Sequence, residues 1–341
     1  MHTFYSPDSA LHNPPFELIE GQMVPPHESQ RRVEIIFDAL AAAQLGPLHT
    51  PEQFDDRHIA AVHSADYLEH LQTIYARWVE AGGHPAAVLA DTLQVRWMNR
   101  FSRSPLALPG YYAYDMSSAI VPGTWRAARG AADCALSGAA LLLAGEQSAY
   151  ALCRPPGHHA GRDLHGGYCY LNNAAIAAEF LATSGQERVT ILDIDFHHGN
   201  GTQQIFYERA DVLTVSLHGD PDRVYPYFLG YADERGAGAG ENTNMNIPLP
   251  KDTTNDAFLA ALAGALERIA QFNPRYLVVS AGVDTFGGDP LGDFALTSAA
   301  YPRIGAAIAA SGLPTLFVQE GGYAVGALGT NVVGLLTGFA A

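Results

Sequence analysis

Short apolar runs that alternate with longer Ala- and Leu-rich stretches constrain the fold of this chain more than any other feature. The apolar runs, each followed within a few residues by Gly or Pro, lie at 149–153, 189–194, 212–217, 276–280 and 315–318. Runs that are apolar on both faces are typical of a parallel sheet covered by helices on both sides. Helix-forming stretches lie at 29–44, 64–81, 125–146, 171–183, 254–271 and 297–311. The alternation predicts an α/β fold with a single doubly wound, mostly parallel sheet flanked by helices on both faces.

One segment, at about residues 82–124, interrupts this alternation. It scatters Gly and Pro among aromatic residues that include Trp97, Phe101 and Tyr112. Loops of this length usually carry a function or pack against another surface, so we expect a lid over an active site or a subunit contact. No repeat, low-complexity tract or linker divides the chain, which predicts one domain over residues 1–341.

Charge and cysteine content limit the partners and the compartment. The chain has 35 acidic and 19 basic residues and no Lys/Arg-rich run, so we expect no nucleic-acid partner. No apolar run reaches the roughly 18 residues of a membrane span, and the N-terminal residues lack the pattern of a signal peptide. The three cysteines have no CxxC spacing, which predicts neither a disulfide framework nor a thiolate zinc cluster. We therefore expect a cytoplasmic protein with no membrane partner.

Two polar residues follow the apolar run at 189–194. Asp195 and His197 are two positions apart, and such residues project to the same face of a strand. A carboxylate and an imidazole side by side are ligand types that suit zinc. Alone, the pattern is equally consistent with a strand end whose polar residues meet water.

Other strand ends carry residues of complementary chemistry. A histidine pair, an aspartate and a tyrosine follow three of the other runs, as His158-His159, Asp284 and Tyr323. In an open α/β sheet the ligand crevice lies outside the carboxyl ends of the strands, so these residues can converge. Asp284 is the natural third zinc ligand, and three protein ligands with an open position are typical of a catalytic zinc.

The remaining side chains can serve a hydrolytic reaction. Zinc polarises a carbonyl and brings the pKa of its water toward about 7. The paired imidazoles can take a proton from water and return it to a leaving amine. Tyr323 can donate a hydrogen bond to a tetrahedral oxyanion, and Asp193 can orient one imidazole or bind a second cation. Singly, each residue has an ordinary explanation as a surface pair, a loop cap or a packed aromatic; together they favour a metal-dependent hydrolase.

Five motifs carry a family resemblance: RPPGHH at 154–159, GGYCYLNN at 166–173, DIDFHHGNGT at 193–202, SLH at 216–218 and EGGY at 320–323. They resemble the zinc deacetylases, which include the histone deacetylases and, more closely, the bacterial acetylpolyamine amidohydrolases. The resemblance runs nearly end to end. It implies an arginase-deacetylase fold and a zinc-dependent amidohydrolase.

The resemblance also implies a role for each matching position. Zinc, with ferrous iron as an alternative, is implied at Asp195, His197 and Asp284. Proton transfer is implied for His159, an electrostatic role for His158 and oxyanion stabilisation for Tyr323. The residues implied to line the substrate tunnel are Gly167, Tyr168, Tyr225 and Leu291. A structural potassium ion is implied at Asp193, Ser216 and Leu217, together with the backbone of Asp195 and His197.

The aromatic insertion bears on assembly and on the substrate. By resemblance, residues 82–124 pair two subunits into a homodimer and narrow the tunnel mouth. The acidic residues with which the polyamine enzymes attract a cationic chain are missing from 104–108 and 116–118, and Asp115 is the nearest acid. The small-molecule amide substrate is therefore either an acetylpolyamine or a neutral amide, such as an N-alkyl amide of a foreign compound or an organophosphate amide. Asn200 stands where many histone deacetylases have Asp, which leaves its partner imidazole without a carboxylate.

Three alternatives remain open. The first is a lysine deacetylase that acts on acetylated peptides. The second is a catalytically silent acyl- or polyamine-binding protein on the same scaffold, which would tolerate loss of a ligand or of Tyr323. The third is an arginase-like hydrolase with two metals, which needs bridging carboxylates beyond the single good ligand set found here.

Overall fold

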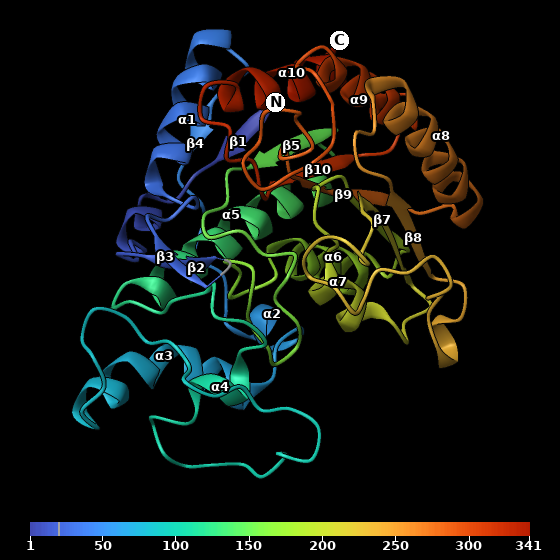
Figure 1. Ribbon diagram of the computed structural model, residues 1–341. Helices are drawn as coiled ribbons and strands as arrows, with labels where there is room; N and C mark the ends of the chain where they lie inside the picture. Colours follow the sequence, from blue (N-terminus) through green and yellow to red (C-terminus); the bar gives the residue numbers. More distant parts are fainter. Residues whose placement is uncertain (20) are drawn as a thin grey trace.

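The computed structural model describes residues 1–19 and 21–341, and its centre is a sheet of eight parallel strands (Figure 1). The strands are β1 (His2–Phe4), β4 (Leu48–His49), β5 (Ser148–Ala151), β6 (Val189–Asp193), β7 (Val212–Gly219), β8 (Asn244–Leu249), β9 (Tyr276–Ala281) and β10 (Thr315–Gln319). Their order across the sheet is β4-β1-β5-β10-β9-β6-β7-β8, and every neighbouring pair is parallel. An antiparallel hairpin of β2 (Glu17–Ile19) and β3 (Gln22–Val24) pairs separately. The predicted α/β sheet is confirmed.

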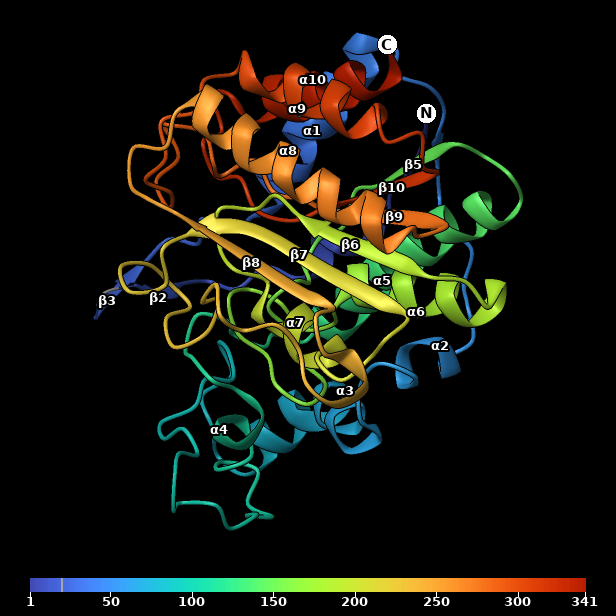
Figure 2. The same ribbon diagram turned by 90° about the vertical axis from the view of Figure 1, so that its right-hand side faces the viewer.

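Helices cover both faces of the sheet, as Figure 2 shows. One face carries α1 (Gln30–Ala43), α8 (Asn255–Phe272), α9 (Ala300–Ala309) and α10 (Leu328–Ala340), and the other carries α5 (Thr124–Leu143) and α6 (Asn173–Gly185). Successive strand residues point to opposite faces. In β6, accordingly, Ile191 packs into the core with α5 and α6, and Leu192 packs into the core with α8 and α9. This is why these strands carry apolar residues on both faces.

Shorter helices lie outside these two layers. They are α2 (Arg57–Ala60), α3 (Ala65–Glu80), α4 (Pro109–Tyr112) and α7 (Asn200–Phe206), with the 3-10 turns η1 (Pro7–Leu11) and η2 (Gly238–Gly240). No helix among residues 1–19 and 21–341 is both long and apolar enough to cross a membrane.

The elements that the sequence pattern does not predict are those that break its periodicity. Strand β8 alternates polar Asn244 and Asn246 with apolar residues and lies at a sheet edge, so it lacks a continuous apolar run. Helix α6 begins at 173 rather than 171 because the Asn172 side chain caps it, accepting a hydrogen bond from the Ala175 N–H at 2.9 Å.

The insertion at 82–124 is mostly irregular and extends from the layered body beside α3 and α4 (Figures 1 and 2). An antiparallel bridge between Val88 and Ile120 closes its base. Part of its aromatic content faces solvent, since Trp97 is 83% exposed and Phe101 is 53% exposed. A second bridge, between Ala113 and His165, joins the insertion to the loop that precedes Tyr168.

Candidate active site

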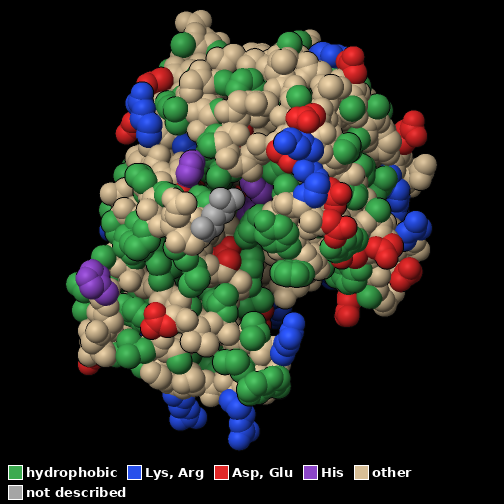
Figure 3. All heavy atoms as spheres, viewed as in Figure 1, with side chains coloured by type: hydrophobic (Ala, Val, Ile, Leu, Met, Phe, Trp, Pro, Cys, Tyr) green, Lys and Arg blue, Asp and Glu red, His purple; other side chains and the backbone are tan. Residues whose placement is uncertain are grey.

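The four central strands of the sheet supply the candidate site. In the order β5-β10-β9-β6 they are direct neighbours, so their carboxyl ends open on one edge of the sheet. The side chains that follow them, in the same order, are His158 and His159, then Tyr323, then Asp284, then Asp195 and His197. On the face in Figure 3, histidine and acidic atoms lie in a depression near the centre.

Asp195, His197 and Asp284 bring three donor groups together. The Nδ1 atom of His197 lies 3.1 Å from Asp284 Oδ2 and 3.4 Å from Asp195 Oδ1. Both carboxylates are fully buried. Burial and the charge of Asp195 raise the pKa of Asp284 to about 7, since two adjacent buried carboxylates destabilise each other unless a cation lies between them. This donor set fits a divalent metal ion such as zinc.

Backbone close to the two carboxylates fixes their orientation. The Gly321 N–H donates to Asp195 Oδ2 at 2.8 Å, and the Phe196 N–H donates to Asp284 Oδ1 at 2.8 Å. A Cβ atom on Gly321 would lie 2.5 Å from Asp284 Oδ2 and 2.6 Å from Asp195 Oδ2. The second position of the EGGY motif therefore has no room for a side chain.

The two neighbouring histidines have different partners. His158 Nδ1 lies 2.9 Å from Asp193 Oδ2, whereas His159 Nδ1 lies 2.7 Å from Asn200 Oδ1, at the start of α7. Because an amide oxygen only accepts, His159 donates from Nδ1 and keeps Nε2 free to accept a proton. Asn200 thus fixes the tautomer of His159 without placing a negative charge beside it.

The electrostatic surroundings of the two histidines differ in a way that matches their hydrogen-bond partners. Burial disfavours a charged His158, but the carboxylates of Asp195 and Asp193 outweigh this effect and raise its pKa well above the usual value. Burial, together with the neighbouring His158 and His197, lowers the pKa of His159 well below the usual value. His159 is therefore neutral and free to accept a proton, whereas His158 is the better fixed positive charge.

Tyr323 is held beside this group by its backbone and by an arginine. Its N–H donates to Asp289 Oδ2 at 2.6 Å, and its ring lies under the guanidinium of Arg32. Burial raises the pKa of Tyr323 well above 10. The phenol therefore stays protonated at neutral pH and remains a hydrogen-bond donor.

The predicted tunnel residues lie around His159 and Tyr323. The Tyr225 ring is perpendicular to the His159 ring, with centroids 5.1 Å apart, and the Tyr168 and Tyr323 rings are 5.8 Å apart. A Cβ atom on Gly167 would lie 2.2 Å from His159 Cδ2. Leu291 is half-buried after β9, and its N–H donates to Asp289 Oδ1 at 3.0 Å. Leu291 is thus tied to Asp289 through its backbone.

The predicted potassium ligands are adjacent in the sheet. Asp193 and Ser216 are register partners on β6 and β7, and Leu217 follows Ser216 in the buried part of β7. The Ser216 hydroxyl lies 2.8 Å from His218 Nδ1. The residues expected to bind potassium are therefore close together. The presence of the ion itself remains a prediction.

Several functional candidates come from segments without a motif. Arg32 on α1 is one. Glu17 on β2 is another: it is 2% exposed, binds the imidazole of His27 through Oε1, and together with burial raises the pKa of Tyr168. A side-chain hydrogen bond between Glu17 and Tyr168 contributes to this rise. Nothing in the local sequence around Glu17 marks it.

Glu320, the first residue of EGGY, also has a role that the motif does not reveal. Its Oε2 accepts hydrogen bonds from the N–H groups of Gly157 at 2.6 Å and His158 at 3.2 Å. This carboxylate therefore joins the Tyr323 turn to the histidine segment. Glu320, His158 and Cys169 form a second buried group of possible metal donors.

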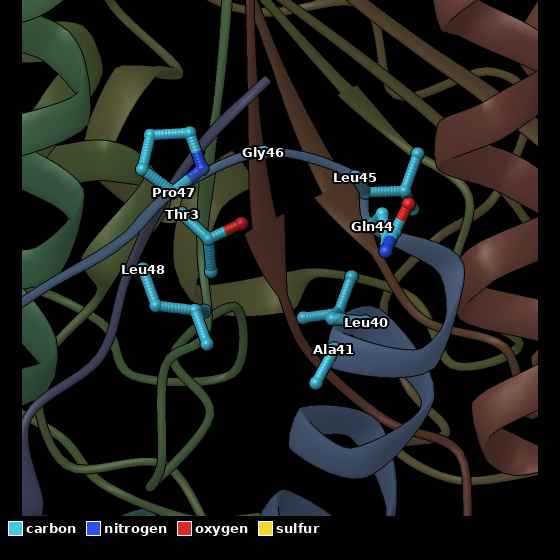
Figure 4. Close-up of a pocket in the computed structure, with 8 residues that line it drawn as sticks. All are labelled: Thr3, Leu40, Ala41, Gln44, Leu45, Gly46, Pro47 and Leu48. Atoms are coloured by element: carbon cyan, nitrogen blue, oxygen red, sulfur yellow. The ribbon is translucent and has the colours of Figure 1, made fainter.

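A surface hollow elsewhere on the molecule has no such chemistry. It has a volume of about 370 Å³ and lies between the end of α1 and the β1 and β4 strands, lined by Thr3, Leu40 and Leu48 among others (Figure 4). None of the candidate site residues lines it. The candidate active site is therefore defined by its converging side chains rather than by this hollow.

Comparison with known proteins shows which family the chain belongs to. The model of the histone deacetylase domain matches residues 26–338. The chain belongs to the histone deacetylase family. The resemblance predicted from the five motifs is thereby confirmed.

Relatives within the histone deacetylase family match over the whole chain. Acetylpolyamine amidohydrolase 1 of Pseudomonas aeruginosa is 47% identical over 99% of both chains, and the acetylpolyamine amidohydrolase of Mycoplana ramosa is 46% identical over 100% of both. A crystal structure of an acetylpolyamine aminohydrolase from Burkholderia pseudomallei has a TM-score of 0.95 at 41% identity, covering 100% of this chain and 99% of that one. The predicted enzyme class, a deacetylase-type amidohydrolase, and the arginase-deacetylase fold are confirmed.

Proposed function

We propose that this chain is a zinc-dependent amidohydrolase that deacetylates small N-acetylated amines bearing a distal positive charge, as acetylpolyamines do. One observation carries the choice of substrate: the buried Glu17 carboxylate lies beside the predicted tunnel residue Tyr168 and has no Lys or Arg partner among the described residues. A buried carboxylate without a Lys or Arg partner is costly, and an ammonium group of the substrate would offset this cost. Glu17 can thus replace the acidic residues missing from the insertion. The names of the full-length relatives support the same substrate class.

The proposed mechanism assigns each step to a side chain. Asp195, His197 and Asp284 would hold zinc, which supplies Lewis-acid assistance by polarising a carbonyl and acidifying water. His159 takes the proton of the attacking water at Nε2 and returns it to the leaving nitrogen. The Tyr323 hydroxyl donates a hydrogen bond to the oxyanion, and His158, paired with Asp193, adds positive charge.

Two substrates of equal length test the role of Glu17. N-(5-aminopentyl)acetamide carries a distal ammonium, and N-hexylacetamide replaces that ammonium with a methyl group. The unmodified enzyme should prefer the cation by about tenfold or more in kcat/KM. Glu17→Gln should abolish most of this preference, whereas Glu69→Gln, an exposed change on α3, should leave it intact. A wild-type preference for the neutral amide would instead favour the xenobiotic or organophosphate amides.

We also propose a homodimer formed through the insertion. The support is its set of exposed apolar side chains, Val95, Trp97, Met98, Phe101 and Leu106, since a large exposed apolar patch usually marks an interaction surface. Light scattering should give twice the chain mass, and a Trp97→Ser/Phe101→Ser double variant should give the mass of one chain. A single-chain mass for the unmodified protein would refute the dimer.

The remaining assignments are proposals of the same kind. A structural potassium ion at Asp193, Ser216 and Leu217 predicts higher thermal stability in a potassium salt than in a salt of an organic cation at equal ionic strength.

The three cysteines are free and buried, which supports a cytoplasmic location. An arginase-like reaction with two metals would need a carboxylate shared between both, but among the described residues the two donor groups share none. Metal counting on the purified protein tests this point.

A further inference from the structure

Asp115, the acid of the insertion nearest to the site, joins two segments of the tunnel wall. Its Oδ2 atom accepts hydrogen bonds from the Tyr225 hydroxyl at 2.6 Å and the Gly167 N–H at 2.9 Å. Tyr225 lies on the loop after β7, and Gly167 lies on the loop before α6. One carboxylate from a third segment thus bridges two walls that are distant in the sequence.

The Oδ2 atom of Asp115 is fully used by donors of the protein. Besides Tyr225 and Gly167, Oδ2 accepts from the Ser117 hydroxyl at 2.9 Å, and Oδ1 accepts from the Ser117 N–H at 3.0 Å. A carboxylate oxygen has two lone pairs, so three donors already saturate Oδ2. Oδ2 of Asp115 is therefore committed to the tunnel wall.

The same part of the insertion holds one wall in an unusual backbone conformation. Gly167 and Tyr168 both have positive φ angles, of 54° and 69°, and this conformation is unfavourable for a non-glycine residue. The Tyr168 N–H donates to the Ser118 hydroxyl at 2.8 Å, and the Gly167 N–H is also 3.1 Å from Ser117 Oγ. These bonds offset that cost and keep the Tyr168 ring in the wall.

The opposite wall is fixed through the Tyr225 hydroxyl. Besides its bond to Asp115, this hydroxyl lies 2.6 Å from the Tyr114 hydroxyl, and the two rings stack with centroids 6.3 Å apart. Burial, followed by the charge of Asp115, raises the pKa of Tyr225 well above 10, so the phenol remains a donor. The Tyr225 ring is thus held against His159 by a polar bond at its far end.

We propose that Asp115 is a specificity-determining residue: by bonding Tyr225 and Gly167 together, it fixes the tunnel at a width that admits a slender, unbranched amine. The proposal rests on the proposed function only in using an N-acetylated amine as the slender substrate. The width of the tunnel follows from the hydrogen bonds by which Asp115 joins Tyr225 on one wall to Gly167 on the other.

Two cationic substrates that differ only in thickness test this proposal. One is N-(5-aminopentyl)acetamide; in the other, a cyclohexane ring replaces the middle methylenes between the acetamide and the ammonium. Asp115→Ala and Tyr225→Phe should each raise the ratio of kcat/KM for the thick substrate over the slender one by about tenfold. Asp91→Ala, which removes an exposed charge from the same insertion, and Tyr111→Phe should leave the ratio unchanged.

Two results would overturn the proposal. In the first, Tyr225→Phe lowers kcat/KM by the same factor for both substrates. Tyr225→Phe keeps the aromatic ring, so it serves as the test if Asp115→Ala does not fold. In the second, Asp115→Ala selectively weakens the ammonium substrate relative to N-hexylacetamide, which would make Asp115 a cation ligand. Turnover of the slender amine by the wild-type enzyme tests the proposed function separately. The tunnel width is tested only by the change in the ratio of kcat/KM values between the thick and the slender substrate.

Discussion

The guanidinium carbon of Arg32 lies 4.8 Å from the centre of the Tyr323 ring. Arg32 is buried, and it donates to the carbonyl oxygens of Gly322 at 2.7 Å and Glu320 at 2.6 Å. A single side chain from α1 therefore packs on the proposed oxyanion donor and holds the turn that carries it. The position of the Tyr323 hydroxyl depends on this long-range contact as well as on the Gly-Gly turn.

Removing the Tyr323 hydroxyl should impair the chemical step. Tyr323→Phe should lower kcat by about 10²–10³-fold with a small change in KM, because the bond to the oxyanion forms only in the transition state. Steady-state kinetics on N-(5-aminopentyl)acetamide provide the measurement. Tyr207→Phe, at the end of α7, is the matched control. A Tyr323→Phe enzyme within threefold of the parent would remove Tyr323 from the mechanism.

Loss of one metal ligand should remove metal and activity together. Asp284→Asn replaces a buried anion beside Asp195 and His197 with a neutral amide, so the bound metal per chain and kcat should fall in parallel. Elemental analysis and turnover are measured on the same sample, and Asp256→Asn on the surface of α8 is the control. Chelation of the parent enzyme should abolish turnover, and added zinc should restore it. Full activity after chelation would contradict the metal-dependent mechanism.

Glu320 should act as a positioning residue for the histidine segment. Glu320→Gln keeps an oxygen acceptor for the Gly157 and His158 N–H groups, whereas Glu320→Ala removes it. We expect kcat to fall less than about tenfold in the Gln variant and about 100-fold in the Ala variant, with KM changing less. Thermal melting of both variants separates this effect from a general loss of stability. Equal kcat values for the two variants would exclude the positioning role.

Buried neutral histidines should make the fold sensitive to acid. Burial lowers the pKa of His70 to about 2 and that of His165 to about 4, while both titrate near 6.5 in the unfolded chain. The unfolded state therefore binds more protons as the pH falls below about 6.5. Each histidine should then cost about 1.4 kcal/mol of unfolding free energy per pH unit, down to its folded pKa.

Urea unfolding between pH 7.5 and pH 5 measures this slope. His70→Leu should flatten it, since neither ring nitrogen of His70 has a hydrogen-bond partner among the described residues. Gln147→Leu, an exposed change that removes no titratable group, should leave the slope unchanged. A slope that is the same in the parent and in His70→Leu would show that His70 titrates alike in both states.

The local periodicity of the sequence is enough to predict some of the site residues. Asp195, His197 and Asp284 are apparent because they end apolar runs whose common direction follows from a parallel sheet. Glu17 and Arg32 are not apparent, because they reach the site from a hairpin and a helix through contacts distant in the sequence, such as Arg32 to Gly322. The role of Asp115 is hidden for the same reason: its partners Gly167 and Tyr225 are 52 and 110 positions away.

The strand order also has a consequence for biosynthesis. Strands β9 and β10, near the end of the chain, occupy the space between β5 and β6. A ribosome-bound chain that has emerged only as far as β8 has its histidine pair and its Asp195/His197 pair, but nothing yet joins them across the middle of the sheet. Such a nascent chain has no completed reaction centre, so hydrolytic activity can begin only once nearly the full length has been synthesised.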